Sequence, residues 1–211
     1  MAIPHVRAYI GLGANIGDAR ATLDRAVSAL SGSPGTRLRG VSRLYATIPV
    51  GVTDQPDFLN AVVALDVPAG PNPATGATNL LAILKSLERR FGRTPRERWG
   101  PRELDLDLLV FGRARLAIER PPEARSVDAD VDPSKATKLL VVPHPEAQFR
   151  LFVLAPLADL APGLKPPGWK ETVETARHRQ ERAEGAETVR PIGTWQPAFR
   201  AWDRSDATLR P

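Results

Sequence analysis

The stretch VSRLYATIPVGVTDQPDFLNAVVALDV, residues 41–67, decides the fold because it holds two strand patterns with no helix between them. Residues 41–48 alternate well enough for one strand, and a loop rich in Pro and Gly follows. In the second strand, residues 58–67, five apolar side chains share one face while Phe58 and Asn60 share the other. Two successive strands of this kind indicate an antiparallel sheet.

Elements on either side extend this pair to a β-α-β-β-α-β order. A short strand at residues 6–11 precedes a helix whose candidate N-cap is Asp18. A second helix ends near Gly92, a residue typical of helix C-terminal caps, and a strand follows at residues 104–111. The order predicts an α+β fold with a ferredoxin-like βαββαβ core, in which an antiparallel sheet carries helices in an α/β/α sandwich.

The chain of 211 residues is long enough for one domain with a tail. We expect one main domain at residues 1–163, interrupted at residues 113–138 by a Pro-, Arg- and Asp-rich insertion without clean periodicity. Residues 164–211 form a C-terminal extension, and their composition leaves open a hairpin, a surface arm or a partly disordered tail.

Composition excludes several classes of protein. With no cysteine, the chain has no disulfide framework and no thiolate metal site. The apolar run at its start is short and broken by Pro4, so we expect neither a signal peptide nor a spanning helix, and predict a cytoplasmic protein. A net charge of +5, carried mostly by arginine, suits an anionic ligand and is weak support for nucleic acid.

The sharpest chemical feature is RWGPRELDLDLL, residues 98–109. In a strand, Asp105 and Asp107 point to the same side, while the leucines between them point to the core. Two carboxylates this close repel each other, and a divalent cation removes that cost. Mg²⁺ prefers such hard oxygen ligands together with substrate phosphates. The alternative is a solvated strand face with two exposed aspartates.

Arginines crowd the approach to this acidic pair. They lie in a segment rich in Gly and Pro, which indicates a loop. Arginine beside aspartate can form simple salt bridges, but a triphosphate also needs cations from both metal and protein. The loop favours the second interpretation, because binding groups are often carried on loops set on a rigid scaffold. The arginines concerned are Arg93, Arg96, Arg98 and Arg102.

The turn GLGANIG at residues 11–17 resembles a dinucleotide-binding loop only superficially. The Gly-X-Gly-X-X-Gly spacing would need glycine at position 16, which is Ile16. A tight turn with close packing of strand and helix is the better interpretation.

Four segments together resemble the 6-hydroxymethyl-7,8-dihydropterin pyrophosphokinase family. They are YIGLGANIGD, YATIPVGVTDQPDFLNAVVALD, GRTPRERWGPRELDLDLLVFG and VPHPEAQFRLFVLAPLADLAP, in that order along the chain. The resemblance implies transfer of pyrophosphate from ATP to 6-hydroxymethyl-7,8-dihydropterin, which gives AMP and the pterin diphosphate. It also implies two Mg²⁺ ions and a monomer. From charge and composition we expect no nucleic acid or membrane partner.

The resemblance assigns roles residue by residue. Both Mg²⁺ ions would be held by Asp105 and Asp107. The catalytic set would be Arg93, Arg102, Asp105 and Asp107. The nucleotide would contact Glu88, Arg98, Trp99, Leu108, His144 and Arg150. The pterin would contact Thr47, Ile48, Val50, Phe58, Asn60, Trp99 and Phe152, with the two phenylalanines stacked on either side of the ring.

Two rival functions remain at this level. The ferredoxin-like sheet also serves RNA-binding modules, but these need a basic, aromatic strand motif that the sequence lacks. An inactive relative that binds pterin or nucleotide would keep the fold without the chemistry. The intact pair of Asp105 and Asp107 argues against the inactive relative.

Overall fold

The computed structural model describes residues 3–49, 54–92, 101–121 and 137–203. Its centre is a six-stranded antiparallel sheet in the order β5-β1-β4-β3-β8, with β2 also paired to β4. These strands are β1 (His5–Ala14), β2 (Arg37–Val41), β3 (Leu44–Thr47), β4 (Phe58–Pro68), β5 (Asp105–Phe111) and β8 (Val189–Gly193).

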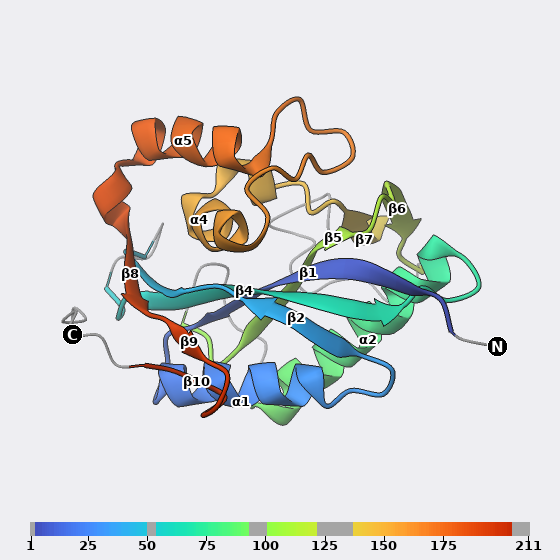
Figure 1. Ribbon diagram of the computed structural model, residues 1–211, viewed down its shortest axis with the longest axis horizontal. Helices are drawn as coiled ribbons and strands as arrows, with labels where there is room; N and C mark the ends of the chain where they lie inside the picture. Colours follow the sequence, from blue (N-terminus) through green and yellow to red (C-terminus); the bar gives the residue numbers. More distant parts are fainter. Residues whose placement is uncertain (1–2, 50–53, 93–100, 122–136, 204–211) are drawn as a thin grey trace.

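Helices cover both faces of this sheet. In Figure 1, α1 (Ala19–Ser31) and α2 (Pro73–Arg90) lie below it, and α4 (Leu151–Leu160) and α5 (Val173–Glu184) lie above it. Two short 3₁₀ helices, η2 (Ala147–Phe149) and η3 (Ala186–Thr188), precede α4 and β8. The predicted α/β/α sandwich around a ferredoxin-like core is therefore confirmed. No helix within the described ranges is long and apolar enough to cross a membrane.

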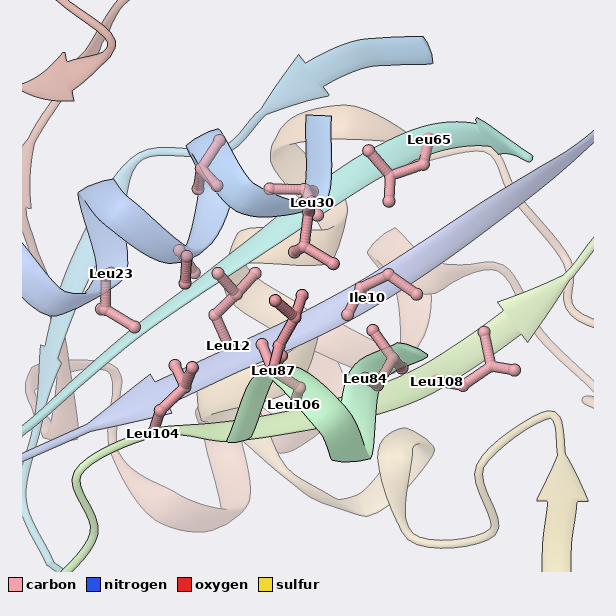
Figure 2. Packing of buried hydrophobic residues seen from close by; sticks show 14 of the residues in the cluster. Ile10, Leu12, Leu23, Leu30, Leu65, Leu84, Leu87, Leu104, Leu106 and Leu108 are labelled. Carbon is pink, nitrogen blue, oxygen red and sulfur yellow. The ribbon is translucent and has the colours of Figure 1, made fainter. Parts of the chain in front are cut away.

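The larger core lies between the sheet and α1 and α2. Asp18 is the N-cap of α1, as expected, and its side chain accepts a hydrogen bond from the backbone N–H of Ala21. Leucines and isoleucines from both helices and from β1, β4 and β5 interlock there (Figure 2). Because one face of each strand is committed to this core, the opposite face of β5 is left for Asp105 and Asp107.

The single strand expected at residues 41–48 is instead two strands, β2 and β3. Ser42 separates them, because its hydroxyl accepts a hydrogen bond from the backbone N–H of Val62 and donates one to the carbonyl of Arg43. Both strands still pair with β4, so the antiparallel order is preserved.

Among the described residues after 163, β8 joins the central sheet and β9 and β10 form a small sheet of their own. Helix α5 packs against α4, β8 pairs with β3, and β9 (Trp195–Gln196) pairs with β10 (Ala201–Trp202). Within the expected insertion at residues 113–138, β6 (Leu116–Glu119) pairs with β7 (Lys138–Val142), which begins at its end, and residues 122–136 lie outside the described ranges.

Candidate active site

One row of residues crosses the sheet on the face covered by α4. Asp105 on β5 lies opposite Gly13 on β1, Gly13 lies opposite Asn60 on β4, and Asn60 lies opposite Tyr45 on β3. Directly opposed residues of neighbouring strands point to the same face. Two strand spacings separate Asp105 from Asn60, which corresponds to about 10 Å. The acidic strand and the amide of β4 therefore share one surface with only a glycine between them.

The acidic end of this row holds two carboxylates and an arginine. Asp105 and Asp107 are both half-buried, and Asp107 lies opposite Gly11. The Arg102 guanidinium donates from Nη1 to Oδ2 of Asp105 at 2.9 Å. Two oxygen donors on one face suit Mg²⁺, which takes its remaining ligands from phosphates and water. No cluster of three or more His, Asp or Glu ligands occurs among the described residues.

Gly13 leaves room beside the Asn60 side chain. A Cβ at this position would lie 3.0 Å from Oδ1 of Asn60, tighter than ordinary van der Waals contact. On the same strand, a Cβ at Gly11 would meet the Leu109 side chain at 3.5 Å, which is an ordinary contact. The glycine turn thus clears room beside Asn60, a role that differs from binding a dinucleotide.

The other end of the row presents an amide and two aromatic rings. Asn60 is buried and donates from Nδ2 to Oγ1 of Thr47 at 2.7 Å, so its orientation is fixed. Phe58 is half-buried on the same face of β4. Ile48, which follows β3, donates from its backbone N–H to the carbonyl of Thr188. Phe152, near the start of α4, packs against the cluster that contains Tyr45.

A histidine lies beside the acidic pair, and an arginine lies near that histidine. The backbone N–H of His144 donates to Leu109 O at 2.9 Å, which places this residue against the end of β5. Burial lowers the pKa of His144 below its ordinary value, and the charge of Asp107 opposes this shift. The guanidinium of Arg150 lies 3.8 Å from the Glu146 carboxylate and 5.8 Å from the centre of the Phe152 ring.

Two residues expected to contact the nucleotide lie apart from this group. Glu88, on α2, is buried on the opposite face of the sheet, where its Oε1 accepts from the backbone N–H of Leu106 and from Nζ of Lys85, each at 2.8 Å. Leu108 belongs to the core on that face. Contact of either residue with the nucleotide stays a prediction. Val50, Arg93, Arg96, Arg98 and Trp99 lie outside the described residues.

Asn15 is a supporting residue that the sequence did not single out. Its Oδ1 accepts from the backbone N–H of Arg102 at 2.7 Å, and its Nδ2 donates to Oε1 of Gln55 and to the carbonyl of Pro56. It is buried, and it ties the loop before Phe58 to the segment that carries Arg102. The available signal was a polar residue between Ala14 and Ile16, at the end of a strand that enters the site.

A second such residue is Asp57, a buried carboxylate directly before β4. Arg190, on β8, donates from Nη2 to its Oδ2 at 3.0 Å. This pair joins the C-terminal strand to the residue before Phe58. Only the structure could reveal the partner, because the two positions lie far apart in the sequence.

A carboxylate pair with a flanking arginine and histidine, set beside polar and aromatic side chains, is typical of a metal-dependent phosphotransferase. A family model described as 7,8-dihydro-6-hydroxymethylpterin-pyrophosphokinase matches residues 9–162. A 2-amino-4-hydroxy-6-hydroxymethyldihydropteridine pyrophosphokinase of Pseudomonas aeruginosa is 40% identical over 80% of this chain and 88% of its own length. The protein of that name from Bacillus subtilis is 39% identical over 72% of this chain and 77% of its own length.

Solved structures share the fold at low sequence identity. A Plasmodium falciparum HPPK-DHPS crystal structure with pterin and p-hydrobenzoate has a TM-score of 0.67 and 14% identity, covering 96% of this chain and 50% of that chain. This chain thus spans about half the length of such two-part proteins. The chain belongs to the 7,8-dihydro-6-hydroxymethylpterin-pyrophosphokinase family.

Proposed function

We propose that the chain carries out its family's reaction on the sheet face that holds Asp105 and Asp107. The reaction transfers pyrophosphate from ATP to 6-hydroxymethyl-7,8-dihydropterin in folate synthesis, giving AMP and the pterin diphosphate. The strongest support is the row from Asp105 through Gly13 to Asn60, because it sets the acidic residues and the pterin amide about 10 Å apart. A diphosphate and a hydroxymethyl group fit between sites at this separation.

Asp105 and Asp107 hold the metal in this proposal. Two Mg²⁺ ions, when bound, would neutralise charge on the ATP phosphates. The pair of hard oxygen donors on one face supports this assignment. Arg102 already donates one hydrogen bond to Asp105, and a guanidinium has further N–H donors for a phosphate oxygen.

The pterin lies at the Asn60 end of the site. Asn60 and Thr47 are joined by a hydrogen bond, so the Asn60 amide is held ready to bond the polar edge of the ring. Phe58 and Phe152 supply apolar faces for stacking. The hydroxymethyl oxygen then points along the row toward the acidic residues, in position to attack the β-phosphorus in line while AMP leaves.

His144 and Arg150 complete the phosphate side. Burial lowers the pKa of His144 and so favours the neutral imidazole, which can still donate a hydrogen bond to a phosphate oxygen. Arg150 supplies positive charge for the transferring group. The proposal keeps the roles that the resemblance gives to three further residues. Arg93 belongs to the catalytic set, Arg98 contacts the nucleotide, and Trp99 contacts both the nucleotide and the pterin. The proposal includes a monomer, a cytoplasmic location and a domain boundary at residue 163, as the resemblance and the composition imply.

Product analysis tests the function directly. Protein, ATP, Mg²⁺ and 6-hydroxymethyl-7,8-dihydropterin are mixed and the nucleotides are separated. AMP with pterin diphosphate supports the proposal, whereas ADP would mean single phosphoryl transfer and a misassigned reaction.

Two variants separate the halves of the site. Asp105→Asn should abolish Mg²⁺-dependent nucleotide binding and turnover while pterin binding, measured without nucleotide, persists. Asn60→Ala should do the reverse, weakening pterin binding while leaving nucleotide binding intact. If Asp105→Asn still binds ATP in a Mg²⁺-dependent manner, the metal assignment is wrong.

A further inference from the structure

Three side chains of α5 form hydrogen bonds to the backbone that leads into α4. Arg179 donates from Nη2 to the carbonyl of Gln148 at 2.7 Å, and Gln180 donates from Nε2 to the carbonyl of Phe149 at 2.9 Å. The guanidinium of Arg179 also lies 5.8 Å from the centre of the Phe149 ring. Two successive peptide carbonyls are thus held by neighbouring residues of one helix.

The third side chain caps α4. Oε1 of Glu184 accepts from the backbone N–H of Leu151 at 3.2 Å. The N-cap of α4 is Arg150, whose side chain makes no capping hydrogen bond. Glu184 therefore supplies from α5 an acceptor for the N–H of the first residue of α4, one of the four N–H groups that have no partner within a helix. Its negative charge also suits a helix N-terminus.

The three side chains are also hydrogen-bonded to one another. Gln180 donates from the same amide nitrogen to Oε1 of Glu184 at 2.7 Å, and its own carbonyl oxygen accepts from Nη1 of Arg179 at 2.6 Å. Arg179 is fixed in turn by Glu171, whose Oε1 lies 2.9 Å from its Nε. Linked hydrogen bonds of this kind orient one another, so the three side chains act on the segment as a unit.

The segment that they hold carries two residues of the proposed site. Arg150 and Phe152 flank Leu151, the residue whose N–H is capped by Glu184. On the other side, Phe152 packs against a buried cluster that includes Tyr45 and Val189. The direction in which both side chains leave the chain depends on a backbone fixed by α5.

We propose that Arg179, Gln180 and Glu184 are positioning residues for the reaction, which orient Arg150 toward phosphate and Phe152 toward pterin by fixing the backbone of residues 148–151. This inference rests on the proposed function, because the roles of Arg150 and Phe152 belong to it. It gives a task at the active site to a helix that lies beyond the segment matched by the family model.

The double variant Gln180→Ala/Glu184→Ala tests this positioning role, and two further variants serve for comparison. Arg182→Ala, an exposed change on the same helix, is the control, and Glu184→Gln keeps an oxygen acceptor for Leu151. Amide hydrogen exchange of residues 149–154 should be faster in the double variant only. Its pterin Kd, measured without nucleotide, should rise roughly two- to tenfold, the range expected when hydrogen bonds that fix a contact are lost.

The activity measurements distinguish positioning from general stability. Measured well below the unfolding temperature, kcat should fall in the double variant, while Arg182→Ala and Glu184→Gln stay close to wild type. Faster exchange with unchanged pterin Kd and kcat would overturn the positioning role while the proposed function stands. Unchanged amide hydrogen exchange of residues 149–154 would mean that the α5 side chains do not fix this backbone, and would overturn the inference. A wild-type protein that binds no pterin would overturn both the proposed function and this inference.

Discussion

Gly13 lies between Asp105 and Asn60, and its lack of a side chain leaves the surface between them open. In Gly13→Ala, the new Cβ would lie 3.0 Å from Oδ1 of Asn60, and that amide cannot turn away freely because Thr47 holds its other end. Asn60 should shift by a few tenths of an ångström, and pterin affinity should fall several-fold, on the order of 1 kcal/mol. Titration of pterin fluorescence with each protein measures this directly.

Gly11→Ala is the matched comparison for this change. It lies on the same strand and the same face, but its Cβ would meet Leu109 at an ordinary 3.5 Å. Its effect on pterin affinity should be smaller than that of Gly13→Ala. Equal effects from both substitutions would mean that strand propensity, and not displacement of Asn60, is responsible.

Some residue roles followed from alternation alone, and others could not. The period of two in a strand was enough to put Asp105 and Asp107 on one side and the leucines in the core. Glu88 is different, because a helix position says nothing about which neighbour an acidic side chain will meet. Its hydrogen bond to the N–H of Leu106 depends on how α2 crosses β5.

At the scale of elements, one carboxylate ties three strands together far from the site. Asp66 on β4 accepts from Nε of Arg7 on β1 at 2.6 Å and lies 3.2 Å from Nε of Arg39 on β2. The hydrogen bond from Arg7 lowers the pKa of Asp66 below its ordinary value of 3.8. The unfolded chain therefore binds this proton more readily than the folded chain.

The sign of the pH dependence follows. The stabilisation is present above the unfolded pKa of 3.8 and is lost as the pH falls through the lower folded value. Asp66→Asn should lower the free energy of unfolding by about 0.2–1 kcal/mol at pH 7, because both arginines are partly exposed. Urea unfolding of both proteins between pH 2.5 and 7 should show this difference vanish in acid, and a constant difference would contradict it.

The number and type of elements were largely predictable, and their interruptions were not. Apolar periodicity identified α1, α2 and β4 because each buries a full face. The break between β2 and β3 depends on one hydroxyl, that of Ser42, whose partner on β4 is twenty residues away. Such a bond exists only after β4 has docked, so local sequence carries no signal for it.

At the scale of the whole molecule, the C-terminal part closes the core on the side of α1. Trp202 is 3% exposed, and its Nε1 donates to the carbonyl of Ser42 at 2.8 Å. Its backbone N–H donates to Oδ1 of Asp24, and its ring packs edge-on against Trp195 with centres 4.8 Å apart. A residue near the end of the described chain is thus part of the central core.

Trp202→Ala should therefore lower the free energy of unfolding far more than is usual for a residue near the end of a chain. Loss of a buried tryptophan typically lowers the free energy of unfolding by about 3–5 kcal/mol. Phe199→Ala, three residues earlier and 81% exposed, should change it by less than about 0.5 kcal/mol. Chemical denaturation of the two variants checks the contrast, and a small effect of Trp202→Ala would mean that residues 195–203 do not stabilise the core.

The role of these last residues could not be foreseen from composition. Pro, Trp and charged residues without periodicity suit a loose tail as well as a docked one, so the sequence left the shape of residues 164–211 open. What decides it is complementarity with distant surfaces. Arg20 on α1 donates to the carbonyls of Ile192 and Asp203, two contacts that no local pattern encodes.

The pairing of β8 with β3 has a consequence for biosynthesis. On the ribosome, β1 to β5 emerge before Val189–Gly193 have been translated, so the nascent sheet presents the open edge of β3. An unpaired edge can accept a strand from another chain. Chaperones that shield exposed strands should therefore bind nascent chains most strongly in the interval between completion of β5 and arrival of β8.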